Sequence, residues 1–528
     1  MTTYADAVDA LLAEEILDVS AFAGRALGVL RQIRSPEVWA RVYERGLDAA
    51  FAQHDMDGLA AVASLALVRF DALGRLDQAL SHIEFALAMA YGLPDAIVLL
   101  EAFRASALAV QGDVAGAQEA LRTAKRQLPR VLSARSRGEY VASSAVVSCL
   151  ALDVDDLPAV RQAVGLAEQE GEHASAAYVM SWLIPLMFAA GKMEEAEPWN
   201  QALRVHARSI PHRYREADAE TFAFAARAAR GPGNSAVPFR LAADSGNWLA
   251  TFRQCALQLR NAILTGDWSV ADQMLARLDR ASTRMSRGCV DALPCFHALV
   301  NAYQTGTERV VVPDPRSASL ITLSGLLAAG EAVAIAGTQS DALKWLGTLE
   351  RSIPHGVRTS LEWPVACDRV IGLLRVRAGS VREAVRAFRE AMQWAASAGY
   401  EAEAALAQVQ LAEVMSLTEI ASSERARTRL RRAGWMKLLE MEIDPKPHAY
   451  AATRALALRD DVSVRPQLTP RQVEVLGLLA EGLTYRDAAE RLGTSWRTVS
   501  TQAYQAYERL GVSGKWEAVR TARRLQIL

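Results

Sequence analysis

Apolar residues recur at helical spacing along almost the whole chain, and the alternation that is typical of β-strands is nearly absent. Residues 1–458 are rich in Ala, Leu, Arg and Glu, which favour helices. After a polar stretch at residues 459–467, the helical pattern resumes in residues 468–528. The pattern therefore predicts an all-α protein in which a linker joins a long helical region to a short one.

The long region contains a recurring Gly-x-x-x-x-Ala pattern, in which glycine permits a tight turn and alanine lets two helices approach closely. Successive copies lie about 40 residues apart, or about twice that distance, at Gly74/Ala79, Gly112/Ala117, Gly191/Ala196, Gly231/Ala236, Gly266/Ala271, Gly337/Ala342 and Gly379/Ala384. Degenerate copies fill the two long intervals, and three further copies are out of phase: Val154/Ala159, Gly306/Val311, Gly58, Gly171 and Gly399. Each in-phase copy predicts one helix hairpin.

The clearest unit, Gly379, Ala384, Phe388 and Ala391, is similar to the tetratricopeptide repeat in order and spacing. The resemblance implies an α-solenoid of about nine or ten hairpins, whose concave face could hold a small-molecule or protein effector. Aromatic residues of this region are expected in the core. The alternative is that some of the eleven Trp residues line a ligand surface, for example Trp363 or Trp394.

Residues 468–528 read as four short helices with explicit start and stop signals. Thr469, Thr484, Ser495 and Ser513 are in position to cap them, and Gly482, Gly493 and Gly511 follow the first three. Apolar side chains predict a small core at Val475, Leu476, Leu479, Ala488, Ala489, Leu492, Val499, Ala503, Ala506, Leu510, Ala518, Val519 and Ala522. The second and third helices, joined by a two-residue turn, form a helix-turn-helix.

A run of framework positions supports a more specific interpretation. These positions are Leu468-Thr469-Pro470-Arg471, Glu474-Val475-Leu476, Ala480-Glu481-Gly482, Ala488-Ala489-Glu490-Arg491-Leu492, Thr498-Val499 and Leu510-Gly511-Val512-Ser513. In order and spacing they resemble the LuxR-type DNA-binding domain, over about an eighth of the chain. The resemblance implies that the third helix enters the major groove of double-stranded DNA.

Carried over by position, the DNA-contacting residues of the third helix are Trp496, Arg497, Thr498, Ser500, Thr501, Tyr504 and Gln505. At the start of the second helix, Thr484 and Arg486 are placed to hold backbone phosphate. The family usually has Lys where this chain has Ser500, and His where it has Gln502. Because cations supply salt-dependent affinity, two hypotheses stand: a domain that reads DNA, or a degenerate one that contacts protein.

Two further surfaces of the protein each allow two interpretations. The fourth helix resembles the surface through which such domains pair, so Trp516 and Val519 are expected either to hold a homodimer on DNA or to cover the domain's own core. Upstream, Arg425, Arg429 and Arg432 share one helical face. They are interpreted either as a solvated face or as an auxiliary basic patch that contacts phosphate.

Composition excludes several classes of protein. The net charge is −1, with nine basic and six acidic residues in residues 468–528, a weak basic bias. Five scattered Cys indicate a reducing compartment, and the first residues lack a signal peptide, which predicts a cytoplasmic protein. The uncharged stretch Ala174–Ala190 contains Pro185 and falls where a buried repeat helix is expected, so no membrane span is predicted.

Signatures of catalysis are missing. No phosphate-binding loop is present, so the nucleotide-hydrolysing module of the MalT-like regulators is not evident, and Cys289, Cys295 and His297 match no zinc pattern. We expect no enzyme activity, metal or cofactor. The sequence predicts a bacterial-type transcription regulator that binds DNA, with RNA polymerase as one protein partner. The alternative is an interaction scaffold whose altered third helix no longer reads DNA.

Overall fold

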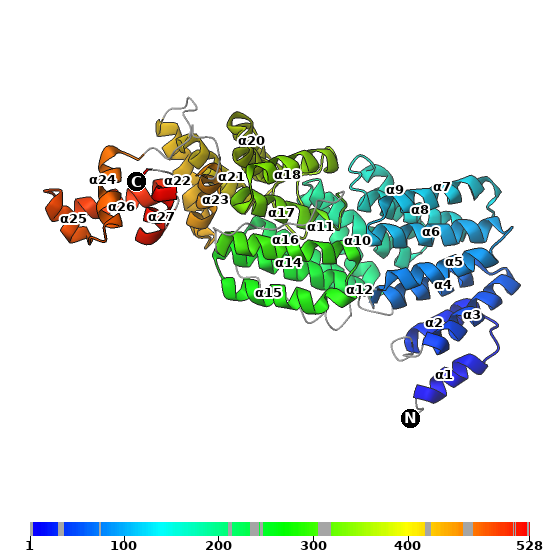
Figure 1. Ribbon diagram of the computed structural model, residues 1–528. Coiled ribbons are helices and arrows are strands. Elements are labelled where there is room, and N and C mark those ends of the chain that lie inside the picture. Colours follow the sequence, from blue (N-terminus) through cyan, green and yellow to red (C-terminus); the bar gives the residue numbers. More distant parts are fainter. Residues whose placement is uncertain are drawn as a thin grey trace.

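The structure, a computed structural model, describes residues 4–29, 36–72, 75–209, 214–232, 242, 247–304, 318–417, 424–457, 468–510, 512, 514–524 and 527–528. Within these residues every regular element is a helix, which confirms the all-α prediction. The helices stack from the blue amino-terminal end to the red carboxy-terminal end of an elongated molecule (Figure 1). We refer to residues 4–457 as the body and to residues 468–528 as the tail domain.

The described helices of the body are α1 (Tyr4–Ala13), α2 (Val19–Val29), α3 (Pro36–Gln53), α4 (Met56–Ala72), α5 (Leu76–Met89), α6 (Pro94–Gln111), α7 (Val114–Gln127), η1 (Leu128–Arg130), α8 (Ala134–Leu150), α9 (Leu157–Gln169), α10 (His173–Ala189), α11 (Met193–Arg208), α12 (Tyr214–Arg230), α14 (Trp248–Thr265), α15 (Trp268–Ala281), η2 (Ser282–Arg284), α16 (Arg287–Gln304), α17 (Leu323–Ala336), α18 (Gln339–Ser352), α19 (Cys367–Ala378), α20 (Val381–Ser397), α21 (Glu401–Leu417), α22 (Glu424–Glu440) and α23 (Pro445–Ala457). Those of the tail domain are α24 (Pro470–Ala480), α25 (Tyr485–Arg491), α26 (Trp496–Leu510) and α27 (Lys515–Arg524). The predicted linker at 459–467 lies outside the described residues.

Many body helices pack against the next helix and the next but one. Thus α6 contacts α7 and α8, α8 contacts α9 and α10, and α14 contacts α15 and α16. Four glycines of the predicted pattern lie between paired helices with left-handed φ angles of 75° to 99°, and the alanine of each copy is buried: Gly112/Ala117, Gly191/Ala196, Gly266/Ala271 and Gly379/Ala384. The glycine-turned hairpins are therefore present, while the tetratricopeptide-like solenoid stays a prediction.

Other copies of the pattern have different outcomes. Out-of-phase Gly171 and Gly399 are also left-handed, and they lie between hairpins instead of within them. The degenerate copy at Val154/Ala159 is wrong in detail, because Leu152 makes the left-handed turn (φ 60°) and Ala159 is exposed. Gly74, Ala236, Gly306 and Val311 lie outside the described residues.

A non-helical segment at residues 353–366 connects α18 to α19, and its residues 359–366 are buried. The backbone N–H groups of Arg358 and Thr359 donate to the carbonyl oxygen of Ala189, at 2.7 and 3.2 Å. Trp363 is fully buried and stacks on Phe296 with ring centres 4.9 Å apart. Trp363 is therefore a core residue, and the hypothesis that it lines a ligand surface is wrong.

An ion network in the interior joins helices that are distant in sequence. Arg369 of α19 is fully buried, with its guanidinium 2.7 Å from Glu403 of α21 and 3.2 Å from Glu331 of α17. Arg260 of α14 lies 2.6 Å from the other oxygen of Glu403. Burial alone would raise the pKa of Glu331, but Arg369 and Arg260 lower it to about 2. The body is consequently tied together across helices as well as between neighbouring hairpins.

The apolar stretch that raised a membrane question forms α10, which is buried among other helices, including Pro185. In the described part of the chain, no helix combines the length and apolarity needed to cross a bilayer. Cys289 and Cys295 are buried in α16, and burial raises the pKa of both thiols. His297 points instead to Asp279, 3.1 Å away.

Candidate nucleic-acid interface

Side-chain caps define where the helices of the tail domain begin. The Thr469 hydroxyl accepts from the N–H of Gln472 at 3.2 Å, and the Gln472 side chain accepts from the N–H of Thr469 at 3.0 Å. Thr484 and Asp487 form the same reciprocal pair at α25. At α26, the Ser495 hydroxyl accepts from the N–H of Thr498 at 3.1 Å. These caps confirm three of the four helix starts expected from sequence.

The helix α26 is the centre of the tail domain, because it packs against α24, α25 and α27. The predicted core positions are buried, except that Leu492 is only partly buried. Between α25 and α26, Gly493 has a left-handed φ of 60°. The fold thus places a short helix, a tight turn and a longer helix in sequence, which is the helix-turn-helix arrangement.

The face of α26 opposite the core is open to solvent. Trp496 is 51% and Tyr504 58% exposed, and Arg497, Thr498, Thr501 and Gln505 are also exposed, whereas Ser500 is half-buried. The Arg497 guanidinium lies 5.9 Å from the centre of the Trp496 ring. The Thr501 hydroxyl donates to the carbonyl oxygen of Arg497 at 2.9 Å, which leaves its lone pairs and its methyl group for a ligand.

Not every residue assigned to DNA contact is equally available. The Thr484 hydroxyl donates to Asp487 at 2.8 Å, a bond that helps to lower the pKa of that carboxyl group. Gln505 accepts a hydrogen bond from Gln472 at 3.4 Å. Arg486 is exposed and has no hydrogen bond or ion pair to any described residue. Arg486 and Arg497 are therefore the site cations that are best placed to meet phosphate.

Other basic residues of the tail domain hold the fold together, which the sequence analysis missed. Arg471 donates to the carbonyl oxygen of Leu492 at 3.1 Å, and Lys515 donates to that of Leu483 at 2.8 Å. Arg509 donates to the Gln472 side chain at 3.0 Å. The only signal in the sequence was the position of Leu483 and Leu492 at helix ends, where carbonyl groups lack helical partners.

Trp516 and Val519, the two residues proposed for pairing of tail domains, differ in their exposure to solvent. Trp516 is 75% exposed, with the Lys515 ammonium 5.6 Å from its ring centre. Val519 is buried in the core of the tail domain. Of the two alternatives, core packing therefore describes Val519, and Trp516 alone is available as a pairing surface.

The arginine run on α22 divides into two sets. Arg431 lies 2.6 Å from Glu413, and Arg427 donates to the carbonyl oxygen of Met415 at 3.2 Å. Within the described residues, Arg425, Arg429 and Arg432 are exposed and have no hydrogen bond or ion pair. The predicted common face of Arg425, Arg429 and Arg432 is thus open to solvent.

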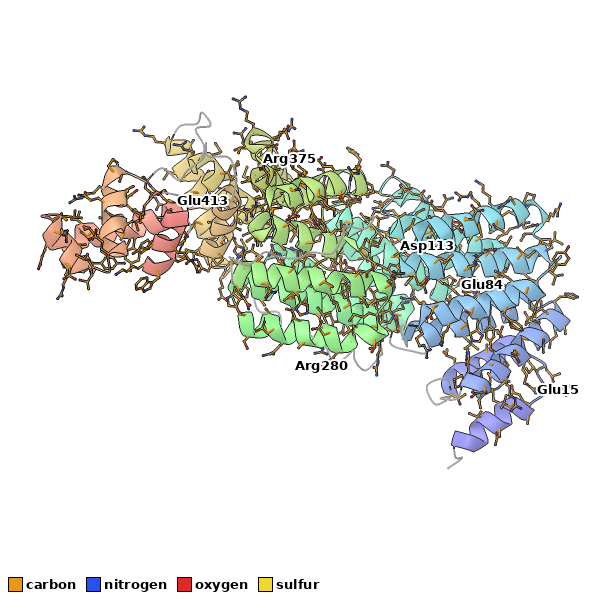
Figure 2. All side chains as sticks on the ribbon, viewed as in Figure 1. Glu15, Glu84, Asp113, Arg280, Arg375 and Glu413 are labelled. Atoms are coloured by element: carbon orange, nitrogen blue, oxygen red, sulfur yellow. The ribbon has the colours of Figure 1, made fainter. Side chains whose placement is uncertain are left out.

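The tail domain meets the body at α23, which contacts α26. Figure 2 labels Glu413 close to this junction. Burial raises the pKa of Glu413, Arg431 opposes that shift, and the negative charge of Glu508 on α26 adds to it. Because Glu508 lies near the end of α26, the junction involves the opposite end of this helix from Trp496 and Arg497.

Comparison with known proteins supports this interpretation of the tail domain. Residues 466–522 match the family described as "Bacterial regulatory proteins, luxR family". A stretch of 48 residues is 42% identical to the "Methanol utilization control regulatory protein MoxX" of Paracoccus denitrificans, covering 9% of this chain and 22% of that protein. No solved structure matches. The similarity is confined to a small part of both chains, so it identifies a helix-turn-helix domain of the LuxR type and does not extend to the body.

Proposed function

We propose that this protein is a sequence-specific DNA-binding transcription regulator in which α26 enters the major groove. The observation that carries the proposal is the two-faced structure of α26. One face builds the core of a domain that matches the LuxR family, and the other exposes Trp496, Arg497, Thr501 and Tyr504. A helix seated in this way can present three or four side chains to base edges while its partner helix contacts the backbone.

The exposed groups suit both kinds of contact. Arg497 can reach phosphate or guanine, the Thr501 methyl can meet a thymine methyl, and Tyr504 can donate to an acceptor on a base or a phosphate. Arg486 adds a cation at the start of α25. With only two partner-free cations among these residues, affinity of one tail domain should be modest, so pairing into a homodimer through Trp516 would contribute much of the total.

We further propose that the body controls this domain. A small-molecule or protein effector, or RNA polymerase, would bind the body and change pairing or release of the tail domain. The contact between α23 and α26 supports this role, because a change in the body can alter the position of α26 directly. Control requires that the effector bind two states of the protein with different affinity. This mechanism is that of a cytoplasmic regulator and needs no catalytic step.

The test begins with genome-wide mapping of the DNA bound by the full chain, followed by anisotropy titrations on a recovered fragment at several salt concentrations. Arg486→Ala combined with Arg497→Ala should abolish binding at physiological salt and reduce the logarithmic salt slope by about 1.8 for two lost phosphate contacts. Arg520→Ala removes one cation from an exposed position on α27, so it is the control for each of the two single substitutions and should bind nearly as the parent does. Unchanged affinity of the double variant would refute the proposal.

A specific observation also favours the alternative, an interaction scaffold. The outward face of α26 offers two large exposed aromatic rings, Ser500 and Gln502 stand where the family usually has cations, and Gln505 is bonded within the domain. Aromatic rings with few charges are typical of protein interfaces. Failure of the mapping to enrich any sequence, together with salt-independent behaviour of the fragment titrations, would favour the scaffold.

A further inference from the structure

The helices α20, α21 and α22 meet at a groove in the body that none of the assignments above explains. Both α20 and α22 pack against α21, and Figure 1 shows α22 beside the tail domain and α20 farther from it. One hollow of about 460 Å³ is lined by Gln408, Arg425, Ala426, Arg429, Leu430 and Ala433. A second, of about 280 Å³, adjoins it at Ala426 and Leu430.

The floor of the second hollow is apolar. Its lining residues Met392, Leu411, Met415 and Leu430 come from all three helices. Methionine side chains adapt to differently shaped apolar partners, so such a floor can receive large aliphatic or aromatic side chains. The two hollows share Ala426 and Leu430, so they lie side by side along α22, where one helix face could place successive anchoring side chains.

The rim of the groove is cationic. Arg425 and Arg429 line the first hollow, and Arg389 and Arg427 line the second, whereas none of the described acidic side chains lines either one. Within the described residues, Arg389, Arg425 and Arg429 have no hydrogen bond or ion pair. An apolar floor between uncompensated guanidinium groups is complementary to an amphipathic surface whose polar edge is acidic.

We propose that this groove binds an acidic amphipathic α-helix of a partner protein. The occupant's apolar residues would enter the two hollows, and its Glu and Asp residues would meet Arg425, Arg429 and Arg389. The walls are helices, which offer no unpaired backbone edge, so an extended peptide would gain no main-chain hydrogen bonds. A lipid bilayer is too flat to reach a floor below the helices that bound it. This proposal rests on the partner-binding role proposed for the body.

The alternative to an acidic helix is that the arginines of α22 contact the phosphates of DNA. Such contact would involve Arg432 as well as Arg425 and Arg429, and it would not require the apolar floor. Arg432 lies on the exposed face of α22 but lines neither hollow. The matched pair Arg429→Glu and Arg432→Glu therefore separates the two uses with the same change of charge on the same helix.

The experiment measures binding of three fluorescein-labelled peptides to the full chain. The first is an amphipathic helix of about 15 residues with Leu on one face and Glu on the other. The second has Lys in place of each Glu, and the third has the composition of the first with its amphipathic order scrambled. We expect the first to bind and the other two to bind at least about tenfold more weakly.

Variants then locate the site. Arg429→Glu should weaken binding of the acidic helix about fivefold, and Arg425→Glu combined with Arg429→Glu more than tenfold, while Arg432→Glu leaves it within about twofold. Met392→Ala should also weaken it, by removing part of the floor. Circular dichroism of each variant must match the parent, and any variant that fails is replaced by the corresponding Gln or Leu substitution.

Several results would overturn the proposal. One is equal binding of the acidic, basic and scrambled peptides, and another is equal loss with Arg429→Glu and Arg432→Glu. A third is a duplex DNA titration in which both charge reversals lower the salt slope, which would assign the arginines to phosphate. Because Arg486→Ala with Arg497→Ala should leave peptide binding intact, failure of DNA reading and failure of the groove are distinguishable.

Discussion

The body buries charged side chains in its interior, whereas the tail domain keeps them on its surface. In the body, paired ions lie between packed helices: Arg253, Arg260, Arg369, Glu331, Glu362 and Glu403. Among the described residues of the tail domain, the buried polar side chains are Gln472 and Thr521, neither of which is charged. Two all-helical regions of one chain therefore specify their folds by different means.

The difference follows from size. A large helical body can enclose ions with their partners. Because a buried guanidinium without a carboxylate partner is costly, the helices must pack so that the partners meet. A small domain has little interior, so it depends on short aliphatic side chains, helix caps and cations that bind helix-end carbonyl groups. The difference also bears on function, because the charged side chains that the tail domain keeps on its surface can contact DNA.

The comparison is tested most strongly by Arg369→Met. The variant leaves Glu331 buried without its main cation, and it removes one of two cations from Glu403. Breaking a buried pair in this way should lower the free energy of unfolding of the body by about 3–5 kcal/mol. Denaturant unfolding followed by tryptophan fluorescence measures the loss.

The control is Arg375→Met on the same helix, which removes a partly exposed pair with Glu350 at 2.8 Å. This change should cost less than about 1 kcal/mol. If Arg369→Met and Arg375→Met lower the free energy of unfolding equally, the buried ion network stabilises the body no more than a surface ion pair does.

The next largest effect on stability is expected from protonation of the buried His448 as the pH is lowered. Burial and the nearby Arg260 lower the pKa of His448 from 6.5 to about 4, and its Nε2 lies 3.2 Å from the carbonyl oxygen of Leu264. Below pH 6.5 the unfolded chain binds a proton that the folded chain resists, so stability falls as pH decreases towards 4. Between pH 6.5 and 5 the loss from this residue should be about 2 kcal/mol.

His448→Gln removes this part of the pH dependence, whatever its effect on stability at neutral pH. Between pH 6.5 and 5 the free energy of unfolding of the parent should therefore fall by about 2 kcal/mol more than that of the variant, measured from unfolding curves at pH 7, 6 and 5. Parallel pH profiles would contradict the assignment. The Glu331 carboxyl group, with a pKa of about 2, contributes only below about pH 4.5 and does not interfere.

The side-chain cap of α25 should have an intermediate effect on the stability of the tail domain. Thr484→Ala and Asp487→Ala each break this reciprocal cap, and loss of the N-cap hydroxyl in Thr484→Ala should destabilise the tail domain by about 1 kcal/mol. Amide hydrogen exchange of α25 and α26 measures the effect. If Thr484 also contacts phosphate, DNA affinity should fall more for Thr484→Ala than for Asp487→Ala, and equal losses would confine Thr484 to capping.

The smallest effect on stability is expected for Trp516→Gln, because this side chain is largely exposed. The tail domain should lose less than about 0.5 kcal/mol, while sedimentation of the protein on a two-site DNA fragment should show reduced pairing. Undiminished pairing would remove Trp516 from the proposed dimer surface. Val519 is unsuitable for this test, because its substitution would also disrupt the core.

Local sequence signals were sufficient to predict the helices and the outline of the candidate site. Thr469 and Thr484 could be predicted as caps because a capping side chain acts within three residues of the helix start, and the structure pairs them with Gln472 and Asp487. The helical period separated the buried Val499 and Ala503 from the exposed face of α26. The Gly-x-x-x-x-Ala pattern likewise predicted turns such as those at Gly112 and Gly379.

What depends on distant contacts could be decided only by the tertiary structure. The sequence presents Arg369, Glu331 and Glu403 as ordinary charged residues on separate helices, and packing alone brings them together in the interior. Packing also decides between the alternatives for Trp363 and Val519 by burying both in the core, and it places Arg425 and Arg429 at the rim of a groove. Helix period and caps act within a few residues, whereas burial depends on which helices the whole chain places side by side.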